Sequence, residues 1–193
     1  PVTILDIGIG NARLPKHLCG IKEIWDKVDF YEGTDNAMAC VEISNSEIVK
    51  LNIGDKVAVH FFEAINLDKW SKKYDMVIMT WFTAGNFYPD NFPFDTYRGS
   101  GQNLDLTSNE KFVTIFKNAY LLLNPGGEIV IGACYIDSDA TRLKQEESYH
   151  KMGMTVITSP EDSFTATKEG FWSQRFTKEK LLNYLHFVDP AKI

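Results

Sequence analysis

The feature that most constrains the fold lies at the start of the chain, in the run VTILDIGIG at residues 2–10. A short run of Val, Ile and Leu is typical of a strand buried in a parallel sheet. Two glycines, Gly8 and Gly10, end this run, and a helical pattern follows over residues 11–19. The order of strand, glycine turn and helix predicts the first unit of an α/β fold.

The alternation continues along most of the chain. Apolar runs predict four more strands, at residues 28–33, 57–62, 75–80 and 128–135. Helical patterns predict helices at residues 37–51, 109–123, 139–152 and 177–185. Connections of this kind favour a mostly parallel sheet with ligands at the carboxyl ends of the strands. Because 193 residues suit one domain, we expect a single domain over residues 1–193.

Asp6 stands directly before the glycine turn. In a dinucleotide-binding fingerprint this turn brings a pyrophosphate to a helix N-terminus, where a negative side chain would repel it. The fingerprint also needs a glycine where Arg13 stands. Asp6 therefore argues against a phosphate ligand and for a ligand with positive or hydroxyl groups.

A second acid, Asp35, comes at the tip of the second predicted strand in YEGTDNA. A carboxylate at this point can accept both ribose hydroxyls of a nucleoside. Taken alone, Asp6 is explained more simply as a strand-end cap and Asp35 as a helix N-cap. Taken together, the two acids would bracket a nucleoside from different strand ends.

With these motifs in order, the chain resembles the class I methyltransferases that use S-adenosylmethionine. The motifs that carry the resemblance are DIGIG at residues 6–10, YEGTDN at 31–36, FEAI at 62–65, KYDMVI at 73–78 and LNPGGE at 123–128. Ala12 stands where the family often has a third glycine. The resemblance covers nearly the whole chain and implies a Rossmann-like fold, with a mostly parallel sheet of the seven-stranded type and helices on both faces.

The resemblance also implies which residues bind the cofactor. Gly8 and Gly10 would give the methionine part access to the backbone, and Asp6 would help to hold its amino end. Asp35 would accept the ribose hydroxyls, and Glu63 would accept the adenine amino group. The full predicted set is Asp6, Gly8, Gly10, Asn11, Arg13, Asp35, Asn36, Glu63, Ala64, Ile65, Thr80 and Trp81.

Residues 85–108 form a long connection that is rich in aromatic side chains and has no helical or strand period. Such a segment is more often a binding loop or lid than a plain connection, and we expect an acceptor lid here. The alternative is a satellite cluster that packs the loop against the sheet. The predicted substrate-binding set is Phe82, Asn86, Phe87, Tyr88, Tyr97 and Trp172. No residue is assigned as a catalytic base.

The implied activity is transfer of the sulfonium methyl group to a small-molecule acceptor through an N-, O- or C-nucleophile. A net charge of −6 and a pI near 5.2 disfavour a nucleic-acid partner. One alternative is a non-catalytic S-adenosylmethionine-binding module. Another, ranked lower, is an NAD-dependent oxidoreductase, which leaves Asp6 unexplained. An aminopropyl-transferring relative would need acids after the fourth strand, where the chain has Thr80, Trp81 and Phe82.

Composition bears on the compartment and on metals. No apolar run approaches the roughly 18 residues of a membrane helix. The three cysteines lack a CxxC pair and the four histidines lack metal-ligand spacing, so neither suggests a metal site. We expect a cytoplasmic protein without a bound metal or membrane partner, and the oligomeric state stays open. Because Pro1 directly precedes a strand, we also expect residues upstream of it.

Overall fold

The structure is a computed structural model that describes residues 1–80, 83–99, 106, 108–132 and 135–192. The chain divides into two compact units. The first unit comprises Pro1–Thr83 and Ile115–Gly132, and the second comprises Ala84–Thr114 and Ala133–Ile193. The single domain over residues 1–193 stays a prediction.

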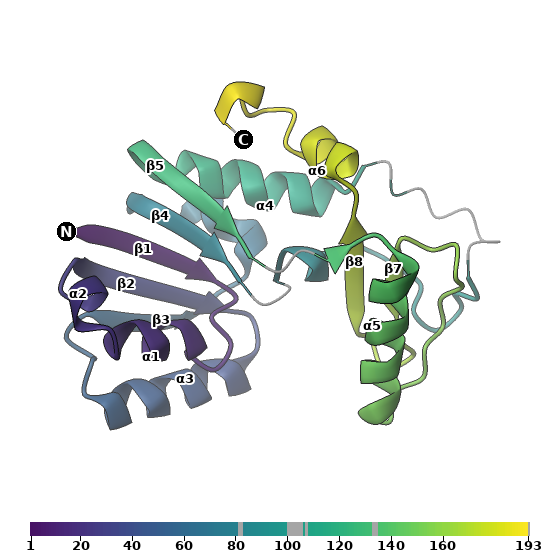
Figure 1. The fold of residues 1–193 in the computed structure, drawn as a ribbon, viewed down its shortest axis with the longest axis horizontal. Coiled ribbons are helices and arrows are strands. Elements are labelled where there is room, and N and C mark those ends of the chain that lie inside the picture. The colour runs from purple at the N-terminus through teal and green to yellow at the C-terminus, as the bar shows by residue number, and fades with distance from the viewer. Residues whose placement is uncertain (81–82, 100–105, 107, 133–134, 193) are drawn as a thin grey trace. The chain divides into compact units, whose positions relative to one another are not determined.

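The first unit is built on a parallel sheet of five strands in the order β3-β2-β1-β4-β5 (Figure 1). The strands are β1 (Val2–Ile7), β2 (Val28–Asp35), β3 (Val57–Phe61), β4 (Tyr74–Met79) and β5 (Leu123–Ile131). The predicted α/β class is confirmed. The described sheet has five strands rather than seven, because the later strands pair with one another in the second unit.

Helices connect these strands. They are α1 (Arg13–Cys19), α2 (Lys22–Trp25), α3 (Met38–Leu51), α4 (Glu110–Leu121), and the short 3-10 helices η1 (Ala64–Lys69) and η2 (Thr83–Asn86). Residues of α4 belong to both units. The first helix begins two residues later than the sequence pattern indicates, because Ala12 has a left-handed backbone with a φ of 56°.

One buried apolar cluster of the first unit lies on one face of the sheet. Ile4 of β1, Tyr31 of β2 and Ile78 of β4 are buried there against α3. The register pairs Ile4 with Tyr31 and, two residues further, Asp6 with Gly33. Because side chains alternate along a strand, Asp6 points to the same face as this apolar cluster. The fold therefore places a carboxylate within its core.

Glu32 lies on the opposite face of β2 and is 2% exposed. It accepts hydrogen bonds from the Tyr74 hydroxyl at 2.5 Å and from Lys72 Nζ at 2.8 Å, and His60 Nε2 lies 3.0 Å from it. Burial alone would raise the pKa of Glu32, but these hydrogen bonds and the nearby positive charges hold the pKa below its usual value. Glu32 therefore joins β2 to β3 and β4 as an ionised group.

The second unit contains a three-stranded sheet in the order β6-β8-β7 (Figure 1). Its elements are β6 (Tyr135–Ile136), α5 (Asp139–Lys151), β7 (Phe164–Ala166), β8 (Trp172–Phe176), α6 (Lys178–Tyr184) and η4 (Pro190–Lys192). The two predicted C-terminal helices are confirmed. Thr177 caps α6 by accepting a hydrogen bond from Lys180 N at 3.1 Å.

One face of β8 carries a buried cation, Arg175, which is 1% exposed. Its Nε donates to Asp137 Oδ1 at 3.1 Å, and its Nη1 donates to Gln145 Oε1 and Thr165 Oγ1, each at 2.8 Å. Its Nη2 donates to the carbonyl of Asp162. A buried charge is tolerated only with such partners, so this network holds β6, β7, β8 and α5 in one arrangement.

We expect Glu32→Gln to lower the free energy of unfolding at pH 7 by about 1–3 kcal/mol, because the buried Tyr74 hydroxyl and the more exposed Lys72 lose a charged acceptor. The folded-state pKa of Glu32 lies below its ordinary value of 4.5, so its contribution is present above pH 4.5 and is lost as the pH falls through the folded-state pKa. Denaturant unfolding at several pH values would check this. The difference between the two proteins should narrow in acid.

Glu47→Gln is the control, because the partners of Glu47 in the described part of the chain are Lys16 and Lys50, whose side chains are largely exposed. Ion pairs of that kind contribute little to stability. A difference between wild type and Glu32→Gln that stays constant into strong acid would contradict the assignment of Glu32 as a stabilising carboxylate.

Candidate cofactor site

The predicted cofactor residues of the first unit lie around the carboxyl ends of β1 to β4. In the sheet Ile7 pairs with Thr34, and Asp35 pairs with Phe61. The amides of Gly8 and Ile9 both donate to the Thr34 carbonyl, at 2.8 and 3.0 Å. These bonds fix the glycine turn to the end of β2, at the sheet edge where ligands bind in parallel α/β folds.

The two glycines of the turn serve different purposes. Both have left-handed backbones, with φ of 78° at Gly8 and 62° at Gly10. A Cβ on Gly8 would lie 2.6 Å from the Thr83 side chain, so glycine here makes room for packing. A Cβ on Gly10 would meet nothing within 4 Å. Gly10 is therefore the position where a ligand can approach the backbone of the turn.

Asp35 fixes the same turn from the end of β2. Its Oδ2 accepts a hydrogen bond from Gly10 N, and its Oδ1 accepts one from Ala37 N, each at 2.9 Å. The carboxylate thus orders both the glycine turn and the approach to α3. Each carboxylate oxygen can accept a further bond, so Asp35 can still receive hydroxyl donors from a ligand.

Asp6 is the most unusual group at this edge. It is 1% exposed, and its Oδ2 accepts a hydrogen bond from the Tyr31 hydroxyl at 2.5 Å. Its Oδ1 is buried and has no hydrogen-bond partner among the described residues. Burial raises the pKa of Asp6 to about 7, the Tyr31 hydrogen bond lowers it and the charge of Asp35 raises it. A buried acceptor without a partner is rare in folded proteins and calls for a donor from outside the described residues, such as a water molecule or a ligand.

The remaining predicted cofactor residues follow the same strand ends. Glu63 follows β3 and is exposed, Ile65 lies in η1 and is half-buried, and Thr80 follows β4 and is half-buried. Asn11, Arg13 and Asn36 are exposed, and Ala64 is half-buried. Trp81 lies outside the residues that the structure describes. The structure therefore links Asp35 to Gly10 by a hydrogen bond and leaves the roles of the others as predictions.

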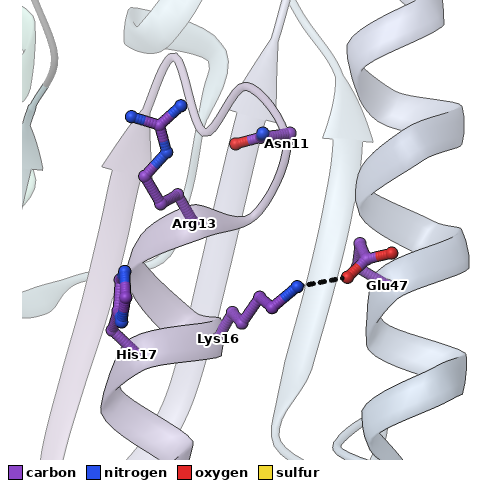
Figure 2. A pocket seen from close by; sticks show the side chains of 5 residues that line it. All are labelled: Asn11, Arg13, Lys16, His17 and Glu47. Atoms are coloured by element: carbon purple, nitrogen blue, oxygen red, sulfur yellow. Dashed lines mark hydrogen bonds and ion pairs between the residues drawn. The ribbon is translucent and has the colours of Figure 1, made fainter.

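A cavity of about 420 Å³ begins directly after the glycine turn. It is lined by Asn11, Arg13, Lys16, His17 and Glu47 (Figure 2). Lys16 Nζ lies 2.9 Å from Glu47 Oε2 across it. Asn11 and Arg13 are shared with the predicted cofactor set, so this cavity continues the polar surface beside the turn.

The predicted substrate-binding residues of the second unit fall into two groups. Asn86 is exposed, and Phe87 and Tyr88 are half-buried. Tyr97 and Trp172 are buried in an aromatic cluster whose other buried members are Phe92, Leu106, Phe164 and Ala166. This packing is what the satellite-cluster alternative describes, and the acceptor lid over residues 85–108 stays a prediction. Phe82 lies outside the described residues.

Sequence reasoning missed Tyr31, the hydrogen-bond donor to Asp6. The residues are 25 apart in the chain, and their contact depends on the register that sets Asp6 opposite Gly33. The signal available in the sequence was a tyrosine, Tyr31, two residues before Gly33 in the same predicted strand. Without the register, Tyr31 is indistinguishable from an ordinary core residue.

Comparison with known proteins bears on the fold. No family model matches the chain, and no curated protein matches its sequence. Among solved structures, it is similar to an S-adenosylmethionine-dependent methyltransferase from Clostridium acetobutylicum ATCC 824, with 12% identity, a TM-score of 0.59, and coverage of 95% of this chain and 71% of that one. The chain has the class I methyltransferase fold.

Two further structures share the methyltransferase fold. The CcbJ methyltransferase from Streptomyces caelestis is 11% identical, with a TM-score of 0.56 and coverage of 96% of this chain and 71% of CcbJ. PigF, in its structure with SAH, is 15% identical, with a TM-score of 0.59 and coverage of 95% of this chain. The chain spans only 43% of the length of PigF. These likenesses support the fold alone.

We expect Gly10→Val to reduce the affinity for S-adenosylhomocysteine at least tenfold, because a branched side chain would fill the open approach to the turn. The same change at Gly126 is the matched control. Gly126 also has a left-handed backbone and open space around its Cβ position, but it lies in β5. Both variants should lose about 1–2 kcal/mol of stability from strain. Calorimetric titration and thermal melts of both would check this, and equal binding by the two variants would contradict ligand approach at Gly10.

Proposed function

We propose that the protein is an S-adenosylmethionine-dependent methyltransferase that acts on a small-molecule acceptor. The observation that carries the proposal is the buried Asp6, which lies two residues before the glycine turn and whose Oδ1 has no hydrogen-bond partner among the described residues. An amino group is the kind of ligand that such an oxygen favours, because it brings both a positive charge and donors. The fold supports the proposal, since class I methyltransferases share it.

Asp35 supports a nucleoside beside the amino group. It lies on the strand next to Asp6, and its oxygens keep capacity for two hydroxyl donors while they hold the turn. Adjacent hydroxyls of a ribose match two carboxylate oxygens. A cationic amino acid joined to a nucleoside therefore fits the two acids better than a dinucleotide, whose pyrophosphate Asp6 would repel.

The chemistry requires little covalent help from the chain. Bound S-adenosylmethionine supplies a methyl group on a sulfonium, which is a good leaving group. The residues of this chain need to hold the donor and acceptor in line, exclude water and, for a weakly acidic acceptor, remove a proton. Asp6 and Asp35 would hold the donor in position. The acceptor, its nucleophile and the base are not assigned, because acceptor pockets on a shared fold vary between proteins.

Calorimetric titration against S-adenosylmethionine, S-adenosylhomocysteine and NAD tests the proposal directly. We expect both sulfur nucleosides to bind in the micromolar range or tighter and NAD to bind at least a hundredfold more weakly. Binding of NAD alone would favour the oxidoreductase alternative. Binding of the sulfur nucleosides without methyl transfer to any of a broad panel of small amines, acids and phenols would favour the non-catalytic module.

We expect Asp35→Ala to weaken S-adenosylhomocysteine binding by about 1–3 kcal/mol, because ribose hydroxyls lose their acceptor and the turn loses its anchor. Asp75→Ala is the control. Asp75 also accepts a backbone hydrogen bond, from Thr3 N at 2.8 Å, and one from Asn124, but it lies at the start of β4. Asp75→Ala should lower the melting temperature without changing the affinity. Unchanged affinity in Asp35→Ala would remove Asp35 from the site.

A further inference from the structure

The surroundings of Asp6 give Tyr31 a role beyond packing. We propose that Tyr31 is a positioning residue of the cofactor site, which holds Oδ2 of Asp6, leaves Oδ1 for the ligand and couples binding of an amino group to loss of a proton from Asp6. This proposal rests on the proposed function, because the ligand in question is the methionine part of the cofactor.

The contact is built by the register of β1 and β2. Tyr31 is fully buried, and Gly33, two residues further along β2, lies opposite Asp6. The hydroxyl of Tyr31 lies 2.5 Å from Oδ2 of Asp6. Because Gly33 has no side chain, Ile9 can fold over it, with its Cδ1 2.3 Å from where a Cβ would stand. Ile9 and Tyr31 belong to the same buried apolar cluster.

No lysine, arginine or histidine appears among the groups that shift the pKa of Asp6 within the described chain. Tyr31 and Asp35 act on it from β2, whereas Ile78 of β4 and Ile9 of the turn are apolar. On α3, Cys40 is titratable, and burial and the charge of Asp35 raise the pKa of its thiol. A positive charge that would keep Asp6 ionised must therefore come from outside these surrounding residues.

The protonation states follow from this environment. Burial raises the pKa of Asp6 to about 7, with the Tyr31 hydrogen bond opposing the rise. Burial and the charge of Asp6 raise the pKa of Tyr31 well above its usual value, so Tyr31 remains a neutral donor. The free protein therefore holds a carboxylic acid in part of its molecules at neutral pH. When an ammonium group binds at Oδ1, the acid O–H bond breaks, the electron pair stays on the carboxylate and the proton passes to solvent.

The sign of the pH dependence is fixed by these states. Below pH 7 Asp6 is mainly neutral and attracts an ammonium group weakly, and above pH 7 it is mainly ionised. Affinity for S-adenosylhomocysteine should therefore rise about tenfold between pH 6 and pH 8 and fall again at higher pH, where the amino group of the ligand loses its proton. At pH 7 binding should release a fraction of a proton, which calorimetry in two buffers of different ionisation enthalpy measures.

Tyr31→Phe keeps the ring and removes only the hydroxyl. Loss of the donor raises the pKa of Asp6 further, so we expect the rising part of the affinity curve to move to higher pH, with severalfold weaker binding than wild type at pH 7. Tyr74→Phe is the matched control, because Tyr74 is also a buried tyrosine that donates to a carboxylate, Glu32, at 2.5 Å. Tyr74→Phe should leave the curve in place. An unshifted curve in Tyr31→Phe overturns the proposal.

A second measurement separates this proposal from the proposed function. Carbon-13 NMR of carboxyl-labelled aspartate follows Asp6 in the ligand-free protein, with Asp6→Asn to assign its signal. We expect a midpoint near pH 7 in wild type, a higher one in Tyr31→Phe and no change in Tyr74→Phe. A midpoint in the ordinary aspartate range overturns the role of Tyr31. If the midpoints behave as expected but S-adenosylhomocysteine binds at no pH, the proposed function is wrong, and so is the coupling of ligand binding to proton loss. The effect of the Tyr31 hydrogen bond on the pKa of Asp6 would still be confirmed.

Discussion

The pairing of β1 with β2 is the constraint on which the candidate site depends. It sets Asp6 opposite Gly33, and this one alignment lets Ile9 close over the sheet and lets Tyr31 reach the carboxylate. A slip of one residue would turn every side chain of β2 to the other face. Glu32 would then enter the apolar core, and Asp6 would lose its donor. The register is strongly specified, because the same slip would move Tyr31 out of the apolar cluster that it shares with Ile4 and Ile78.

Two buried carboxylates on the two faces of this sheet show how partners decide ionisation. Glu32 is 2% exposed and Asp6 is 1% exposed, so their burial is nearly equal. The pKa of Glu32 nevertheless lies below its usual value, since Lys72 and Tyr74 donate to it. The pKa of Asp6 rises to about 7 with Tyr31 alone as donor. Among the described residues, a lysine stabilises the ionised form of Glu32, whereas no lysine, arginine or histidine is among the groups that shift the pKa of Asp6.

Much of the first unit follows from its sequence, because strand and helix are local patterns. The run before Gly8 predicts β1 with the bounds that the structure has, and the acids at strand ends follow once the strands are known. The pattern fails at β5, which begins at Leu123 instead of residue 128. There the Asn124 side chain donates to Asp75 at 2.8 Å, and the pairing with β4 continues through an irregular register. Hydrogen bonds between distant residues extend the strand through the Pro-Gly-Gly sequence. A local sequence pattern does not reveal such bonds.

The aromatic segment of the second unit shows the same limit for function. Sequence alone offered a lid or a packed cluster, and the choice depends on partners far along the chain. Asn109 Nδ2 donates to the Phe87 carbonyl and to Gln174, and Gln174 donates to the Tyr184 hydroxyl. Tyr184 in turn donates to the Leu106 carbonyl at 2.7 Å. This relay uses buried side chains from β8 and α6 to hold backbone near both ends of the segment.

The relay donates hydrogen bonds to the backbone carbonyls of Phe87 and Leu106. These hydrogen bonds therefore do not depend on the side chains at the two positions. Substitutions between these two points can therefore change the chemistry that the segment presents without releasing its ends. The sequence predicts an acceptor lid over residues 85–108. With that lid, keeping the hydrogen bonds of the relay while the other side chains of the segment vary would be one route by which a shared fold acquires different acceptors.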